Sequence, residues 1–202
     1  MTTLAFVALA CGLIIGLGAI GLIALWAMSF YNGTITASES VDKVWGDVLV
    51  RYQERADKTK NLVEIIKGSA EFENTTLREV VEARAKATSI TLDGDNLTPE
   101  NIKAFQEAQD NFTGALSRLM ATVESYPNLK TTDAFRDFQA QYEGMENRIS
   151  VERRKFNEAV RAFNVRIKRF PGNMLAGVFG FQEKGYFEAA EGTENAPDIS
   201  FK

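Results

Sequence analysis

The side chains best suited to hold a metal ion lie together in the sequence TLDGDNLTPE, at residues 91–100. Asp93, Asp95 and Asn96 offer the oxygen ligands that calcium prefers. A calcium-binding EF-hand loop needs a further ligand, a glycine at its sixth position and a terminal glutamate, and the spacing here does not match. An ordinary Asp-Gly turn explains the sequence more simply. We therefore predict no metal site and no cofactor.

Catalytic side chains are scarce. The chain has no histidine, and its single cysteine, Cys11, lies inside an apolar run. This composition excludes Ser-His and Cys-His pairs, imidazole or thiolate zinc sites, and a disulfide within the chain. Gln109 and Glu152 are polar residues inside otherwise apolar helical stripes. A buried glutamate is a functional acid in some proteins, but more often it pairs with an arginine, and nothing nearby completes a catalytic set. We predict no catalytic residue and no enzyme.

The charged residues are segregated along the chain. From Arg148 to Arg169 there are eight lysines or arginines against Glu152 and Glu158, whereas residues 170–202 hold five acids against two lysines. The basic run can pair with the acidic tail, bind nucleic acid or bind anionic lipid. A formal net charge of −4 and the lack of a groove-binding motif argue against nucleic acid. Lipid is the partner that the order of the elements favours.

Four long helices must position these groups. Apolar residues recur at steps of three and four in four ranges of the sequence: 32–72, 75–90, 99–126 and 132–169. Thr98 followed by Pro99 and Glu100 is typical of a helix start. The predicted fold is therefore all-α: a transmembrane helix that continues into an antiparallel up-down four-helix bundle with long helices, over residues 33–172.

An apolar run, LAFVALACGLIIGLGAIGLIALWAMSF, fills residues 4–30. As a helix it measures about 40 Å, enough to span a bilayer with some tilt. It lacks the basic start and short apolar core of a cleaved signal peptide. We predict an uncleaved transmembrane helix over residues 1–32. Small residues at Ala8, Gly12 and Gly16 share one face, which favours close packing of two such helices.

A second apolar stretch, MLAGVFGF, follows the basic run at residues 174–181. Helices one and four have nearly equal predicted lengths, so the end of helix four returns to the bilayer surface. We predict that residues 173–202 form a membrane-proximal apolar segment and an extended acidic tail. The predicted contacts with lipid or a neighbouring subunit are Arg166, Lys168, Arg169, Met174, Leu175, Val178, Phe179 and Phe181. The alternative is that this segment caps the base of the bundle.

Four blocks of the sequence resemble the LemA family. They read NLVEIIKGSAEFENTTLREVVEARAKA, LSRLMATVESYPNLKTTDAF, ENRISVERRKFNEAVRAFNVRIKRFPGN and GYFEAAEGTENAPDISF, in that order. The resemblance covers nearly the whole chain. It departs where the family usually has Ile-Pro, because this chain has Thr59 and Lys60, which implies a straighter first helix. The resemblance implies a bacterial membrane-anchored helical bundle and supplies no catalytic residues.

These observations together predict a non-enzymatic scaffold that associates laterally with its own copies and contacts the bilayer. The alternative is a sensor or adaptor whose bundle binds a small ligand or a partner protein, with a cavity lined by Gln109, Tyr142 or Glu152. Basic residues begin after the span, at Lys43 and Arg51. This asymmetry favours a single-pass protein of the bacterial inner membrane with its soluble domain in the cytoplasm.

Overall fold

The computed structural model describes residues 2–68 and 74–189, and these residues are helical apart from turns, short connections and an extended segment near residue 185. The elements are α1 (Thr2–Lys67), α2 (Asn74–Ser89), a 3₁₀ turn η1 (Gly94–Asn96), α3 (Pro99–Val123), α4 (Pro127–Lys130), α5 (Asp133–Lys168) and α6 (Gly172–Phe179). The prediction of an all-helical protein with one long apolar N-terminal helix is confirmed.

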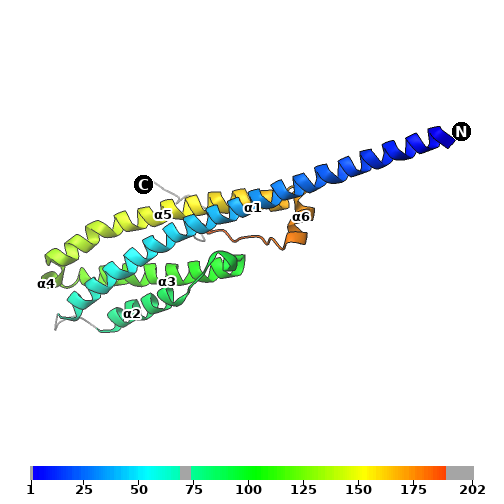
Figure 1. Ribbon diagram of the computed structural model, residues 1–202. Coiled ribbons are helices and arrows are strands. Elements are labelled where there is room, and N and C mark those ends of the chain that lie inside the picture. The colour runs from blue at the N-terminus through cyan, green and yellow to red at the C-terminus, as the bar shows by residue number, and fades with distance from the viewer. Residues whose placement is uncertain (1, 69–73, 190–202) are drawn as a thin grey trace, which may run out of the picture.

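α1 is a single helix of 66 residues, about 100 Å long. It continues unbroken through Thr59 and Lys60. Its N-terminal part projects beyond the other helices in Figure 1. Within the described residues, α1 is the one helix long and apolar enough to cross a membrane.

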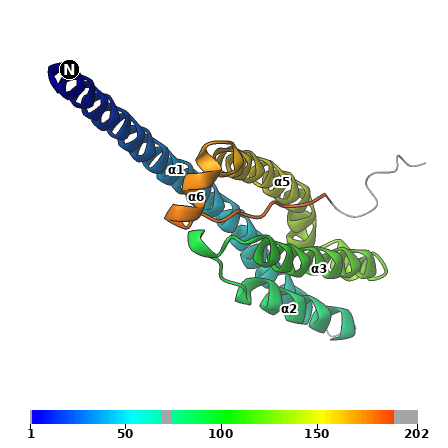
Figure 2. The ribbon, with the colours of Figure 1, turned by 90° about the vertical axis from the view of Figure 1, so that its right-hand side faces the viewer.

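The long helices pair in opposite directions. α5 lies along α1, with Arg166 bonded to Thr34 near one end and Glu146 bonded to Arg55 further along. α2 lies along α3 in the same antiparallel manner (Figures 1 and 2). α2 has only 16 residues against 25 in α3. It therefore accompanies α3 over only part of its length, and it is shorter than α1, α3 and α5.

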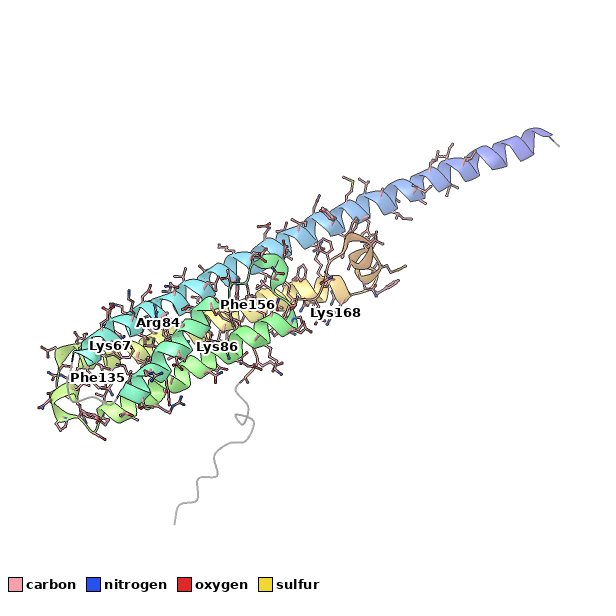
Figure 3. The ribbon with its side chains drawn as sticks, turned by 90° about the horizontal axis from the view of Figure 1, so that it is seen from below. Lys67, Arg84, Lys86, Phe135, Phe156 and Lys168 are labelled. Carbon is pink, nitrogen blue, oxygen red and sulfur yellow. The ribbon has the colours of Figure 1, made fainter. Side chains whose placement is uncertain are left out.

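Among the described residues, two apolar clusters fill the interior. The distal cluster, farther from the projecting end of α1, contains Ala56, Leu62, Val63, Ile66, Leu77, Val80, Ala87, Phe112, Ala115, Leu116, Leu119, Val123, Leu129, Phe135, Phe138 and Met145. The proximal cluster contains Phe30, Val41, Trp45, Val48, Tyr52, Leu92, Leu97, Ile102, Phe105, Ile149, Phe156, Val160, Phe163, Ile167, Ala176 and Phe187. Figure 3 labels one α5 side chain from each, Phe135 and Phe156.

Where α2 ends, other parts of the chain complete the proximal cluster. The loop after α2 contributes Leu92 and Leu97, and the extended segment after α6 contributes Phe187. Trp45 on α1 donates its indole N–H to the carbonyl of Leu92, at 3.0 Å, and so fixes the loop against the helices. The bundle is therefore closed by helix α2 at its distal end and by non-helical chain at its proximal end.

Candidate functional site at the membrane-proximal end

The helix α6 forms the base of the folded domain, beside the point where α1 enters it (Figures 1 and 2). Gly180 ends α6 in the left-handed conformation, with φ of 75°, and the Phe181 N–H donates to the carbonyl of Ala176 at 2.9 Å. A Cβ on Gly172 would lie 2.5 Å from the Phe30 ring, so α6 and α1 approach more closely than any larger residue allows.

The two faces of this base differ. On the inner face, the Phe179 ring contacts that of Tyr31 edge-on at 5.1 Å, and Phe181 lies between Tyr31 and Phe163. Leu175 also packs against the proximal cluster. On the outer face, Met174 is 65 % exposed and Val178 is 77 % exposed. Phe170, which was not among the predicted contacts, is 74 % exposed and extends this outer face.

Arg166 is directed to α1. Its Nε donates to Thr34 Oγ1 at 3.0 Å, and its terminal nitrogen donates to the carbonyls of Ser29 and Phe30, both at 3.2 Å. A Cβ on Gly33 would lie 2.1 Å from that nitrogen, so glycine leaves the space in which the guanidinium crosses α1. The sequence pattern marked Arg166 as basic but did not reveal this role or that of Gly33.

The other predicted basic residues lie at the end of α5. Lys168 is paired with Glu183, and both side chains are largely exposed. Arg169 is exposed, and its N–H caps α5 by donating to the carbonyl of Val165 at 3.0 Å. Figure 3 shows Lys168 close to α6. The outer face of α6 therefore has exposed positive charge beside it.

The predicted transmembrane packing face lies on the projecting part of α1. Gly12 and Gly16 are exposed, and a Cβ built on either would have no other atom within 4 Å. The side chain of Ala8 lies outside the part of the structure that is described. This face is therefore open over the two glycines.

The three residues proposed to line a ligand cavity do not come together. Gln109 is buried, accepts from Arg55 at 2.7 Å and donates to the carbonyl of Ala87 at 3.1 Å. It also lines a groove of about 310 Å³ between α1, α2 and α3, whose lining does not include Tyr142 or Glu152. Tyr142 stacks on Phe138 at the surface of the distal cluster, and burial raises the pKa of its phenol.

Glu152 is buried in α5, where its Oε1 accepts from Lys155 at 3.1 Å. Its partner is therefore a lysine one turn further along the same helix. The arginine that usually pairs with a buried glutamate is not the partner here. The Oε2 atom is buried without a hydrogen bond. Among the described residues, no three acidic, histidine or cysteine side chains gather as a metal site. In the loop at residues 91–100, Asn96 donates to the Asp93 carboxylate at 2.8 Å, as in a closed turn.

Arg55 is a buried charged residue that sequence reasoning missed. It is 1 % exposed and donates to Thr113 at 2.6 Å, to Glu146 at 2.8 Å and to Gln109. These four residues form a polar layer between the distal and proximal clusters. The sequence signal was its position three residues after Tyr52, on the apolar side of α1.

The sequence is similar to those of known proteins. The sequence model of the LemA family matches residues 44–201. Magnetosome protein MamQ 2 of Paramagnetospirillum magneticum is 28 % identical over 175 residues, covering 78 % of this chain and 64 % of that protein. Magnetosome protein MamQ of Magnetospirillum gryphiswaldense is 27 % identical over 174 residues, with the same coverage.

Protein LemA of Metamycoplasma hominis is 29 % identical over 124 residues, covering 61 % of this chain and 53 % of that protein. The chain thus spans less than two thirds of the length of each of these relatives. The apolar helix α1 and these relatives indicate a membrane-associated protein. Since the family match covers well over half of the sequence, the chain belongs to the LemA family.

Proposed function

We propose that the chain is a non-enzymatic scaffold, anchored in the bacterial inner membrane by residues 1–32. Its helices act as one antiparallel bundle in the cytoplasm, associate laterally with other copies and rest on the bilayer through α6. The observation that carries this proposal is the outer face of α6. Its exposed apolar residues lie beside the part of α1 that directly follows the apolar segment.

The energetics favour contact between this face and lipid. Burying Phe170, Met174 and Val178 in the bilayer interface contributes on the order of 1.5–3 kcal/mol each. Each basic residue near an anionic surface adds about 1 kcal/mol, and Arg169 lies at the membrane-proximal end of α5, whereas Glu183 offsets the charge of Lys168. An exposed apolar face next to a transmembrane helix is thus more stable against the membrane than in water.

Site-specific fluorescence tests the contact with the bilayer. A polarity-sensitive dye is placed on Phe170→Cys in a Cys11→Ser background, and the full chain is reconstituted into anionic vesicles. Val50→Cys is the matched control, since Val50 is also exposed but lies on α1 within the bundle. We expect lipid-borne quenchers to quench the dye at position 170 and not at position 50. Equal quenching at both positions contradicts the proposal.

The full chain is the right material for this test. Removing residues 1–32 also removes Phe30 and Tyr31, against which Gly172, Phe179 and Phe181 pack. A truncated domain that failed to bind vesicles could therefore have lost its α6 arrangement. In the full chain, Met174→Asp with Val178→Asp changes only outward-facing side chains, and it should reduce quenching at position 170.

Lateral association is supported by the open glycine face of α1. Cross-linking in native membranes and sizing in mild detergent are expected to show a multimer. Gly12→Leu with Gly16→Leu should weaken it, because the bulky side chains fill the face on which two helices approach. Gly18→Leu with Gly21→Leu is the control, since those glycines are equally open but follow a different line along the helix. A strictly monomeric wild-type chain overturns this part.

The orientation follows from the placement of Lys43 and Arg51 after the span. A phosphatase that is active only outside the cytoplasm, fused to the C-terminus, should be inactive. An active fusion would reverse the assignment.

A second candidate function is that of a small-ligand sensor or adaptor. The groove lined by Tyr52, Gln109 and Phe112 favours it, because an amide beside aromatic rings suits a small ligand with a hydrogen-bonding group. A thermal-shift screen tests this function, since a ligand specific to the folded state raises the melting temperature. The shift should disappear with Gln109→Leu.

A further inference from the structure

Residues 182–189, which we call the strap, lie extended along the bundle after α6. In Figures 1 and 2 the strap runs between α3 and α5. It is bonded to both helices, to Gln106 on α3 and to Asn157 and Asn164 on α5. The strap therefore occupies a groove, and the groove has its own set of side chains that hold an extended chain.

Three side-chain amides of the groove each bind one main-chain unit of the strap. Asn164 donates to the Lys184 carbonyl at 2.8 Å and accepts from its N–H at 3.0 Å. Asn157 binds Phe187 in the same way, at 2.8 and 2.9 Å. Gln106 binds Glu188 likewise, at 3.1 and 2.9 Å. Since each amide pairs with both an N–H and a C=O, the groove recognises an extended backbone whatever its side chains.

Two anchors add sequence preference. The ammonium of Lys184 donates to Asp42 Oδ1 and to the Gly94 carbonyl, both at 3.0 Å, and it lies above the Phe163 ring.

The second anchor, Phe187, is buried in an aromatic cage of Trp45, Phe105 and Phe156, where the ring centroids are 5.4–6.3 Å from its own. Arg153 covers its ring at 4.7 Å. Asp42 and the cage together therefore select a lysine and an aromatic residue three positions later.

Gly185 sets how closely the strap approaches. Its N–H donates to the Leu97 carbonyl at 2.8 Å, and a Cβ there would lie 2.7 Å from the Pro99 Cα. Because the obstruction is backbone, no side-chain rotation relieves it. The groove therefore accepts the pattern Lys-Gly-x-Phe, where x is any residue, which is the sequence of the strap itself at residues 184–187.

We propose that this groove is a binding site for extended peptide and that its second occupant is the strap of a neighbouring copy of the chain. The proposal rests on the lateral association proposed above and names its contact. A strap makes the same bonds in its own groove and in a neighbour's, so exchange loses no contact. A strap prefers its own groove only because it is covalently connected to it, which gives a high effective concentration. A high density of copies in a membrane reduces this preference.

The anchoring of the chain suits such exchange. Because α1 is one helix from the apolar segment to the bundle, every copy presents its groove and strap at the same height above the bilayer. The four residue steps from Gly180 to Lys184 reach about 13 Å when extended. Copies that exchange straps must therefore lie with their α6 helices next to each other.

A charge exchange between two tagged copies tests the proposal. One copy carries Asp42→Lys and the other Lys184→Asp, so each strap is repelled by its own groove and attracted by that of the other. Both copies carry Asn173→Cys on α6, in a Cys11→Ser background, for cross-linking in membranes. We expect mixed pairs to exceed like pairs by at least about tenfold over the random ratio. A chain with both substitutions should pair like wild type.

A second variant covers the case in which the charge variants fold poorly. Gly185→Ala should expel the strap from every groove, lower cross-linking at Asn173→Cys several-fold and expose Lys184 to trypsin. Gly177→Ala is the matched control, because a Cβ there meets no atom within 4 Å. Circular dichroism checks that each variant is helical. Unchanged cross-linking in Gly185→Ala, with its strap released, overturns strap exchange.

The outcomes separate this proposal from lateral association itself. If wild-type copies cross-link but the charge variants pair at random, strap exchange is wrong and lateral association stands. If wild-type copies are monomeric while the charge variants form mixed pairs, the groove accepts a strap from another copy and the scaffold proposal is wrong. If neither associates, both are wrong.

Discussion

The polar layer gives the sharpest test of how the bundle is held together. Arg55 lies with Gln109 and Glu146 at the level where the distal cluster ends and the proximal cluster begins. Its guanidinium makes four hydrogen bonds, and it lies 5.0–5.1 Å from the ring centres of Tyr52 and Phe112. We consider Glu146→Leu, Arg55→Met and the double variant.

The expected costs follow from what each change leaves behind. Glu146→Leu leaves a buried cation without its carboxylate, which costs 3–5 kcal/mol in a closed interior. The Glu146 side chain is 31 % exposed, and Thr113 and Gln109 keep their bonds to Arg55, so we expect about 2 kcal/mol. Arg55→Met leaves the buried Gln109 oxygen without its donor, and we expect about 2–3 kcal/mol.

The double variant shows whether Arg55 and Glu146 act as a coupled pair. Once Arg55 is methionine there is no buried cation to uncover, so adding Glu146→Leu should cost almost nothing more. The double variant should then lose about 2–3 kcal/mol and not the sum of the single losses, a coupling of about 2 kcal/mol. Urea unfolding in detergent, followed by circular dichroism, measures all three values.

The control for this cycle is the exposed pair of Arg118 and Glu79, for which we expect no measurable coupling. If the losses in stability at Arg55 and Glu146 simply add, as we expect for the control pair, the polar layer is not a coupled unit and the assignment is refuted. They would mean that water already compensates Arg55.

Three further predictions follow from buried or tightly packed groups. Burial raises the pKa of Tyr52 from 10.0 to about 12, so the folded chain keeps a proton that the unfolded chain loses between these pH values. The free energy of unfolding should fall over this range by up to about 2.7 kcal/mol, and the fall should be absent in melts of Tyr52→Phe. Phe187→Ala empties the aromatic cage and costs at most about 3–5 kcal/mol, with faster tryptic cleavage after Lys184 as the direct readout. Gly33→Ala displaces the guanidinium of Arg166 and should lower the melting temperature, whereas Gly46→Ala, where a Cβ meets nothing within 4 Å, should not.

The helices were predictable because their signals are local. The Thr98-Pro99 pair predicted the start of α3, and in the structure Thr98 accepts from the Asn101 N–H at 3.3 Å. The apolar stripes of α3 and α5 gave the buried faces, and the apolar run gave the projecting part of α1. The family also followed from sequence, because it is carried by residue types in order along the chain.

The strap and the polar layer were not predictable in this way. An extended segment of eight residues has no helical period, and Asn157, Asn164 and Gln106 look like ordinary surface amides on their helices. Arg55 depends on partners 54 and 91 residues away, which no local pattern connects to it. The role of Arg166 was not predictable either. Its positive charge suggested contact with lipid, whereas its guanidinium donates hydrogen bonds to α1.

Because α1 is one unbroken helix, its apolar N-terminal part and the bundle are rigidly connected. The part of α1 beyond Asn32 extends about 53 Å, and α5 stiffens it along much of that length. A change of about 10° in the direction of the apolar part of α1 therefore moves the far end of α1 sideways by about 9 Å. The direction of the apolar part of α1 therefore determines where the distal cluster lies.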